Sequence, residues 1–424
     1  MSMKGIHGVL VCDVGTSDVK ASVYYLDGSA SNQWESNLTF KNEITKISDK
    51  DVRQMEATGQ EVPPIFQFDG NHKLFTPLEL GKLKMFGTPM DVLDGATHTD
   101  PDYLRASYQH ICQKLSKEFK ISNKLGFDLD SKPERRNWGV FSTITQFDPK
   151  RKIKEEELLN LHKNIITDLG FGYFYARNQT TLSVIANGTK IKQTNPEMDC
   201  ILIDVGGGDM KGFGLVTEVI SGRPQMIPLP GSMRRETLAG KRIEDYFVEN
   251  ARELVKRGGE LRNTTPFLNY LYGKSGKACG VKCYDPSKND FLKNPPPMRI
   301  LREEVSVPEK LRCTPTMLFE PENYNLPDLN GVQTVCDQIV EEAEVQGSSA
   351  ESLLKCVLLV GGTVKYHNVV PRMKEELRKL YSSISDINVV LADVPKYSVV
   401  VGQRLTLNTV VRKQRFFDVF EKIN

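Results

Sequence analysis

The stretch Ile201–Val216 reads Ile-Leu-Ile-Asp-Val-Gly-Gly-Gly-Asp-Met-Lys-Gly-Phe-Gly-Leu-Val, and it decides the fold of this chain. Three apolar residues lead into Asp204, a glycine cluster follows, and a second apolar run returns, which predicts a strand, a tight turn and a second strand. Glycines let backbone N–H groups approach phosphate oxygens, and a carboxylate at a strand end can hold a hydrated divalent metal ion. The stretch therefore predicts a hairpin that binds phosphate.

A second copy of this pattern lies near the N-terminus, in the segment 9–24. Aligning the two segments gives the pattern D-V-G-x-x-D-x-K twice in the same register. The matched pairs are Asp13 with Asp204, Val14 with Val205, Gly15 with Gly206, Asp18 with Asp209 and Lys20 with Lys211. The alternative is two unrelated hairpins with glycine turns, because short motifs do recur by chance. The repeat favours two similar α/β domains that face each other across a nucleotide cleft.

Length and composition indicate a globular protein with two large domains. The chain has 424 residues, 26% of them charged, and a net charge of +2, so neither a nucleic-acid partner nor an acidic tail is indicated. No apolar run approaches the roughly 20 residues that span a bilayer, and the N-terminus lacks the apolar region of a signal peptide. Cys12, Cys200 and Cys356 lie inside apolar runs, which is typical of buried free thiols in a reducing compartment.

Periodicity predicts strands and helices in alternation, the order that produces βαβ units. We expect helices over 104–119, 154–169, 331–345 and 371–381, a helix that opens at 179–188, and strands over 138–144, 172–175, 300–307 and 355–360. The strand 355–360 ends in Gly361-Gly362-Thr363 before a helix, and helix N-termini favour anions. This turn is a second candidate platform for a phosphate or a base, with an ordinary strand-to-helix turn as the alternative.

The predicted domain boundaries follow from the two hairpins and from two poorly patterned segments. The first domain covers 1–186, with an insert at about 27–97, and 398–424 complete it. The second covers 187–397, with an insert at about 241–300. The fold class predicted is therefore α/β, with two similar domains that each carry an inserted subdomain.

These motifs together resemble actin and the actin-related proteins, over most of the chain from Val9 to Leu407. The two hairpins are similar to the two phosphate loops of that family, 179–188 to its connecting helix, and 360–366 to its adenosine motif. Further similar stretches follow in the family's order: Leu229-Pro230 with Arg235, 238–241, 311–313 with 318–321, and 396–399 with Gly402. Sugar kinases and heat-shock chaperones share the hairpins and lack these later stretches. The resemblance implies an actin-like ATPase fold.

The resemblance also implies a role for individual residues. Asp13 and Asp204 would hold Mg²⁺ through water, and Gln179 would orient the attacking water, so these three are the expected catalytic residues. The phosphates would be bound by Gly15, Thr16, Ser17, Lys20, Gly206, Gly207, Gly208 and Asp209, and the adenosine by Gly361, Gly362, Thr363, Tyr366 and Lys396. Phosphoryl transfer requires metal-binding carboxylates, phosphate-binding groups and a residue that orients water, because it depends on positioning and charge stabilisation.

Departures from the family pattern separate this chain from conventional actin. Actins carry an acidic residue where this chain has Gly207 and a His where it has Lys211. Asp209 is the candidate substitute for that carboxylate, and Lys211 would add positive charge near the terminal phosphate. The alternative for Lys211 is a solvated surface lysine, and for Gln179 a simple helix N-terminal amide. The chain also ends about twenty residues after Gly402, where actins carry a longer tail.

We therefore expect a divergent member of the actin family that binds ATP or ADP with Mg²⁺. The first hypothesis is a cytoplasmic, cytoskeletal filament protein that polymerises and hydrolyses ATP slowly, with other copies of itself as partners. The alternative is a scaffold subunit of a larger complex, in cytoplasm or nucleus, that binds ATP structurally beside other actin-family subunits and does not polymerise. A third hypothesis, a small-molecule kinase, needs a catalytic Asp over an acceptor hydroxyl, and no kinase signature supplies one. No membrane span and no nucleic-acid partner are expected.

Overall fold

The chain forms two compact units, each described by itself. Unit 1 comprises Met1–Ala186 with Val399–Asn424, and unit 2 comprises Asn187–Ser398. A computed structural model describes residues 6–15, 18–26, 34–41, 43–58, 65–67, 74–77, 88–91, 93–94, 97–98, 101–120, 135–144, 155–255, 264–272, 297–300 and 303–423. The unit boundaries fall within one helix after Ala186 and at the start of another after Ser398.

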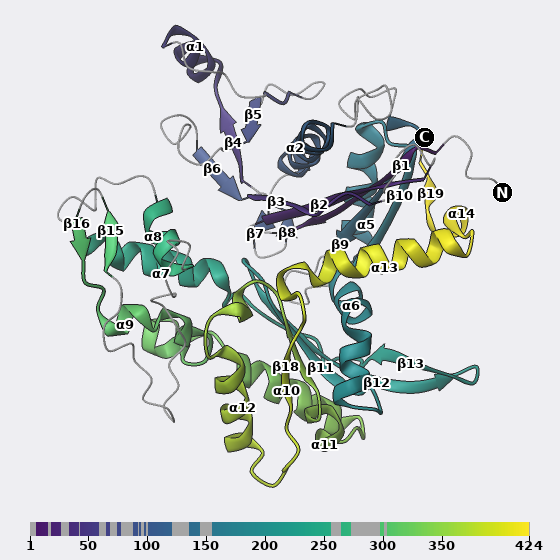
Figure 1. The fold of residues 1–424 in the computed structure, drawn as a ribbon, viewed down its shortest axis with the longest axis vertical. Coiled ribbons are helices and arrows are strands. Elements are labelled where there is room, and N and C mark those ends of the chain that lie inside the picture. The colour runs from purple at the N-terminus through teal and green to yellow at the C-terminus, as the bar shows by residue number, and fades with distance from the viewer. Residues whose placement is uncertain are drawn as a thin grey trace. The chain divides into compact units, whose positions relative to one another are not determined.

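Unit 1 is built on a mixed sheet (Figure 1). Its strands are β1 (Gly8–Val14), β2 (Asp18–Tyr25), β3 (Leu38–Lys41), β9 (Trp138–Ile144), β10 (Tyr173–Asn178) and β19 (Glu421–Lys422). The order across the six-stranded sheet is β19-β10-β9-β1-β2-β3. β1 pairs antiparallel with β2 and parallel with β9, so the predicted N-terminal hairpin and the predicted strand 138–144 are both confirmed.

β1 is buried along its whole length because helices cover both faces of the sheet. Its alternate residues Leu10, Cys12 and Val14 pack in one cluster with side chains of α2 (Pro101–Phe119) and α5 (Glu155–Asp168). Val9 and Val11 pack in a second cluster with α13 (Ser398–Arg412) and the start of α6 (Gln179–Thr194). This strand alternation places Asp13 on the second face, at the end of the strand.

Unit 2 repeats the strand order of unit 1. Its strands are β11 (Cys200–Val205), β12 (Met210–Ile220), β13 (Arg223–Pro228), β14 (Arg234–Glu236), β17 (Val357–Val360) and β18 (Val389–Leu391). The order is β13-β12-β11-β17-β18, and β14 also pairs with β12. In each unit three antiparallel strands come first and two parallel strands follow, β3-β2-β1-β9-β10 in the one and β13-β12-β11-β17-β18 in the other. The chain is thus a mixed α/β protein with two sheets of about six strands each.

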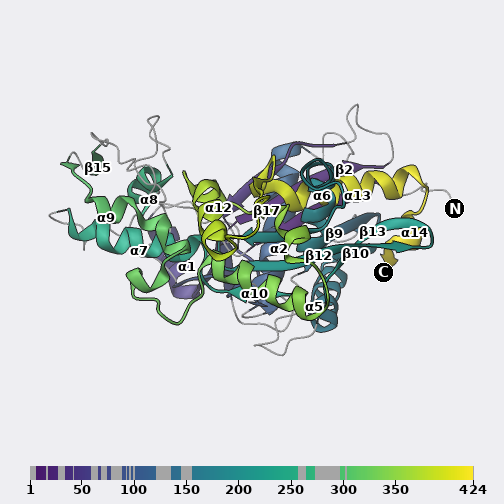
Figure 2. The same cartoon turned by 90° about the horizontal axis from the view of Figure 1, so that it is seen from below.

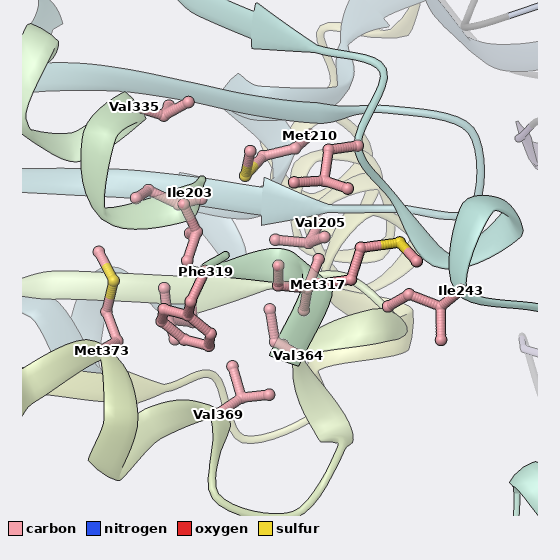
Figure 3. Packing of buried hydrophobic residues seen from close by; sticks show 14 of the residues in the cluster. Ile203, Val205, Met210, Ile243, Met317, Phe319, Val335, Val364, Val369 and Met373 are labelled. Atoms are coloured by element: carbon pink, nitrogen blue, oxygen red, sulfur yellow. The ribbon is translucent and has the colours of Figure 1, made fainter. Parts of the chain in front are cut away.

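The core of unit 2 lies between its sheet and the helices that cover it. Its helices are α7 (Gly240–Glu253), α8 (Thr265–Leu271), α9 (Glu309–Arg312), α10 (Val332–Val345), α11 (Ala350–Leu354) and α12 (Val369–Leu380), with short 3-10 turns η2 (Thr314–Leu318), η3 (Pro321–Tyr324), η4 (Thr363–Lys365) and η5 (Pro395–Tyr397). α10 packs on β12 (Figure 2), and an added Cβ at Gly212 would lie 2.8 Å from Ile339. Figure 3 shows Ile203, Val205, Met210 and Val335 meeting in this core.

The inserted segments form small sheets of their own. In unit 1, β4 (Glu43–Ile47), β5 (Leu74–Pro77) and β6 (Thr88–Asp91) pair beside α1 (Asp49–Ala57), and β7 (Leu93–Asp94) pairs with β8 (Thr97–His98). In unit 2, β15 (Met298–Ile300) and β16 (Glu303–Val305) form a hairpin. The prediction of one strand over 300–307 is therefore wrong, because the chain reverses between Ile300 and Glu303.

The C-terminal residues add an edge strand to the sheet of unit 1. A short helix, α14 (Phe416–Val419), brings Phe416 and Phe420 into a parallel stack with ring centroids 4.3 Å apart. β19 then pairs with β10 at the sheet edge.

The predicted buried free thiols Cys12, Cys200 and Cys356 are confirmed. Within the described part of the chain, no helix is both long and apolar enough to cross a membrane.

The packing predicts opposite effects for two helical glycines. At Gly402 in α13 an added Cβ would lie 2.0 Å from the backbone oxygen of Leu182 in α6, whereas at Gly188 in α6 nothing lies within 4 Å. Gly402→Ala should lower the free energy of unfolding by about 2 kcal/mol, because the helices must separate. Gly188→Ala should leave it unchanged or raise it by about 0.5–1 kcal/mol. Urea unfolding checks both, and equal stability of the two variants would contradict the helix contact.

Candidate functional site

The two glycine hairpins have the same register and the same turn. In unit 1 Asp13 lies opposite Lys20, and in unit 2 Asp204 lies opposite Lys211. Each turn is closed by an equivalent backbone hydrogen bond, from Gly15 N–H to Asp18 O at 3.2 Å and from Gly206 N–H to Asp209 O at 2.9 Å. The repeat predicted from the sequence is thus also a repeat of register and turn geometry.

Asp13 is the centre of the unit 1 site, and its side chain is bound from three directions. Its Oδ2 accepts from Lys20 Nζ at 2.9 Å, and its Oδ1 accepts from Gln179 Nε2 at 2.9 Å and from Thr143 Oγ1 at 3.1 Å. Asp13 is only 1% exposed. A charged carboxylate tolerates such burial when a counter-charge and hydrogen-bond donors surround it.

The helix α6 brings Gln179 to Asp13 because its N-terminus is capped. Asn178 ends β10, and its Oδ1 accepts from Thr180 N–H at 2.9 Å. Asn is a favoured residue at this position, so the helix begins directly at Gln179. The predicted capped helix is confirmed, and it extends to Thr194, beyond the predicted 188.

Two further residues, Thr143 and Gln403, hold β1 and β9 in place next to Asp13, and the sequence predicted neither of them. Gln403 of α13 is fully buried and donates to the carbonyl oxygens of Cys12 at 3.0 Å and Phe141 at 2.9 Å, which ties the helix to β1 and β9. Thr143, one residue before the end of β9, supplies the hydroxyl that reaches Asp13. The only sequence signal for Thr143 was a polar residue at the end of a buried strand.

In unit 2 the turn after β17 lies against Asp204. Gly361 has a φ of +95°, and an added Cβ there would lie 2.2 Å from Val205 O and 2.6 Å from Asp204 Oδ1. Only glycine fits, because a side chain would strain this conformation and collide with the end of β11. The backbone N–H of Gly361 also donates to Pro395 O at 3.0 Å, and Lys396 Cγ would lie 3.9 Å from a Cβ at Gly362.

Thr363 joins the two predicted motifs of unit 2. Its hydroxyl donates to Gly206 O at 2.6 Å, so the predicted adenosine motif contacts the predicted phosphate loop. The start of α7 binds the same loop, with Gly240 N–H to Gly206 O at 3.1 Å and Lys241 N–H to Gly207 O at 2.7 Å. The glycine loop is therefore held by two neighbouring segments.

A cluster of buried charges stands beside this loop. Asp209 Oδ2 accepts from Arg235 Nε at 2.7 Å and lies 3.4 Å from Lys211 Nζ. Lys211 is only 4% exposed, so the alternative of a solvated surface lysine is wrong. Arg235 lies on β14 directly opposite Lys211 of β12. Arg235 belongs to one of the stretches that resemble the actin family, and the sequence alone indicates no role for it.

Two tyrosines form a stacked pair in unit 2. The rings of Tyr366 and Tyr272 are nearly parallel, at 10°, with centroids 6.2 Å apart, and the Tyr272 hydroxyl donates to Glu244. Burial, with contributions from Tyr366 and Glu244, raises the pKa of Tyr272, so its phenol stays neutral. Tyr272 still exposes 40% of its surface. Sequence reasoning missed it because it follows a short helix with no recognisable motif.

The predicted site residues thus fall into two groups. In unit 1 the structure brings together Asp13, Gly15, Lys20 and Gln179. In unit 2 it brings together two sets of predicted residues, first Asp204, Gly206, Gly361 and Thr363, and second Asp209 and Lys211. Gly207 and Gly208 lie in the same turn, Lys396 lies beside Gly362, and Tyr366 faces Tyr272. Thr16 and Ser17 lie outside the described residues.

The donor set around Asp13 limits how it could hold a metal ion. Its Oδ1 accepts two hydrogen bonds and its Oδ2 accepts one, so Oδ2 keeps a lone pair that fits a water of a hydrated Mg²⁺ ion. In the described ranges no group of three or more His, Cys, Asp and Glu side chains has the arrangement of a metal site. The glycine turns with Lys20 and Lys211 on the adjoining strands suit the phosphates of a nucleotide.

A pocket of about 640 Å³ lies elsewhere in unit 2. It is lined by Glu309, Lys310, Cys313, Thr316, Glu320, Asn323 and Tyr324. None of the predicted site residues is in this lining.

A comparison with models of known protein families finds none that matches the chain.

The ion pair at Asp13 should stabilise unit 1. Lys20→Met leaves a buried carboxylate without its counter-charge and should lower the free energy of unfolding by about 3 kcal/mol. The control is Lys163→Met, whose partner Glu421 is 57% exposed, and this change should lower it by less than about 1 kcal/mol. Thermal and urea unfolding measure both, and equal effects would show that the Asp13–Lys20 pair is no stronger than a surface pair.

Proposed function

We propose that this chain is a divergent member of the actin family that binds Mg-ATP. The observation that carries the proposal is the pair of equivalent hairpins, each with an aspartate opposite a lysine at the end of a central strand. A triphosphate with its metal ion carries charges that these residues complement, cations for phosphate and carboxylates for hydrated Mg²⁺.

Each group of residues then has a defined task. The glycine turns offer backbone N–H groups to the phosphates, and Lys20 places a positive charge beside Asp13. Gln179, held in place by its bond to Asp13 and by the helix cap, would orient an attacking water. Hydrolysis at such a site depends on positioning and charge stabilisation. The filament hypothesis expects it to be slow.

Two biological settings fit this activity. In the first, the chain is a cytoskeletal protein whose subunit affinity in a filament changes with bound nucleotide. In the second, it is a nucleotide-holding scaffold subunit of a larger complex. The second is supported by the substituted second loop, where Asp209, the candidate for the missing carboxylate, is held in ion pairs with Lys211 and Arg235.

Charge removal at Asp13 tests the metal-binding role. Asp13→Asn keeps the size of the side chain, and it should weaken ATP binding in Mg²⁺ at least about tenfold, which is 1.4 kcal/mol. With EDTA in place of Mg²⁺ the variant and the wild type should bind alike. Titration calorimetry measures both, with Asp168→Asn, on the surface of α5, as the control. Equal binding of Asp13→Asn and wild type in Mg²⁺ would sink the assignment.

Gln179→Ala should separate hydrolysis from binding. Loss of the amide that positions water is expected to slow ATP turnover about a hundredfold, while ATP affinity stays within about twofold of the wild type. Phosphate release and titration calorimetry provide the two readouts. An unchanged turnover would show that Gln179 is only an anchor of Asp13.

From its stacking with Tyr366, we expect Tyr272 to bind the base of the nucleotide. A base stacked on an aromatic ring contributes about 1–3 kcal/mol, so Tyr272→Ala should weaken ATP binding by about tenfold or more. Tyr272→Phe keeps the ring and should bind like the wild type. Inorganic tripolyphosphate has no base, and its affinity should be the same for all three proteins. If tripolyphosphate binding falls as much as ATP binding in Tyr272→Ala, the residue acts on the fold and not on the base.

Sedimentation separates the two settings. A filament protein should pellet with Mg-ATP only above a critical concentration, and a scaffold subunit should stay in the supernatant at every concentration.

A further inference from the structure

Two carbonyl groups of the second glycine turn are bound by segments that are distant from it in the sequence. The carbonyl oxygen of Gly206 accepts from Thr363 Oγ1 at 2.6 Å and from Gly240 N–H at 3.1 Å. The carbonyl oxygen of Gly207 accepts from Lys241 N–H at 2.7 Å. The start of α7 and the turn after β17 therefore hold both carbonyls in place.

These bonds determine where the N–H groups of the turn point. The peptide bonds of the described residues are trans, and in a trans peptide the C=O and the following N–H point in opposite directions. The N–H of Gly207 therefore points away from Thr363, and the N–H of Gly208 points away from Lys241. Successive N–H groups in a turn can form a concavity that binds anions. The anchored carbonyls thus give the turn the backbone orientation that phosphate binding needs.

Thr363 is itself held in place by its neighbours in the chain. Gly361, two residues earlier, has a φ of +95° and lies so close to the end of β11 that no side chain would fit there. Val364, the next residue, is buried in the core of unit 2. An added Cβ at Gly240 would lie 2.6 Å from Thr363 Oγ1, so the hydroxyl uses space that only a glycine leaves. The position of the hydroxyl is therefore set by the fold.

We propose that the side chain of Thr363 is a positioning group of the phosphate-binding turn and does not act on the adenosine. The inference rests on the proposed function. The hydroxyl fixes the peptide between Gly206 and Gly207, and through this peptide it directs the Gly207 N–H to the phosphates. The resemblance to actin implies an adenosine-binding role for Thr363, whereas its hydrogen bond connects it to the phosphate end of the site.

Loss of the hydroxyl should weaken binding of the phosphates themselves. Thr363→Val keeps the shape of the side chain, and in Mg²⁺ it should weaken binding of ATP and of inorganic tripolyphosphate by the same factor, about fivefold. A residue that contacts adenosine would weaken ATP binding alone, which is the pattern expected for Tyr272→Ala. Thr363→Ser retains the hydroxyl and should restore both affinities. Titration calorimetry measures all of them.

Thr314→Val is the matched control. Thr314 lies in η2 of the same unit, and its buried hydroxyl donates to Leu311 O, also at 2.6 Å. This change removes an equally short hydrogen bond to a backbone carbonyl that is not part of the glycine turn. It should lower the free energy of unfolding and leave both affinities unchanged. An equal loss of affinity in Thr314→Val and Thr363→Val would show a general effect on the fold and would overturn the inference.

The other outcomes also decide the inference. Equal loss of both affinities in Thr363→Val, with recovery in Thr363→Ser, supports it. Loss of ATP affinity alone assigns Thr363 to the adenosine site and overturns it. If Thr363→Val does not fold, Gly240→Ala replaces it, because the new Cβ would displace the hydroxyl and should weaken both ligands equally.

The wild-type protein separates this inference from the proposed function. Wild-type protein that binds neither ATP nor tripolyphosphate overturns the proposed function. Wild-type protein that binds ATP and not tripolyphosphate shows that the turn does not bind phosphates by itself, which overturns this inference. Wild-type protein that binds both, with unchanged affinities in Thr363→Val, overturns only this inference.

Discussion

A carboxylate buried near the end of a central strand is the constraint on which unit 1 depends. Asp13 is almost fully buried, and removing such a charge from water is costly unless partners replace the water. Lys20 from the next strand, Thr143 from the parallel neighbour and Gln179 from a helix N-terminus replace it together. The aspartate therefore fixes where three other elements must lie.

The two hairpins share their register, with an aspartate opposite a lysine, but Asp204 of unit 2 is only partly buried and its surroundings differ from those of Asp13. In unit 1 the aspartate is bound by neutral donors besides its lysine, and the helix that follows β10 begins at its side chain. In unit 2 the strand end meets a glycine turn that only a residue without a Cβ could form, and a cluster of three buried charges stands beside it. One sequence pattern thus leads to two chemical environments, because neighbouring strands contribute Thr39 in one sheet and Arg235 in the other.

Local signals in the sequence predicted the two hairpins and most of the helices. The repeat of Asp, Gly and Lys spacing specified both registers, since turn length fixes the pairing of a hairpin. The sequence did not predict Gln403, whose two bonds to carbonyl oxygens depend on a helix nearly four hundred residues from β1. It also missed the reversal between β15 and β16, because a short apolar run with a polar centre reads equally as one strand or two. The neighbour of Lys211 across the sheet, Arg235, likewise follows only from the placement of β14.

The central claim is that the paired hairpins bind a nucleotide with its metal ion. Its most direct measurement is titration calorimetry of the purified wild-type chain with ATP, once in Mg²⁺ and once in EDTA. The account predicts saturable binding of one ATP per chain that weakens when Mg²⁺ is removed. Absence of saturable binding at millimolar ATP, or an affinity that does not depend on Mg²⁺, would contradict it.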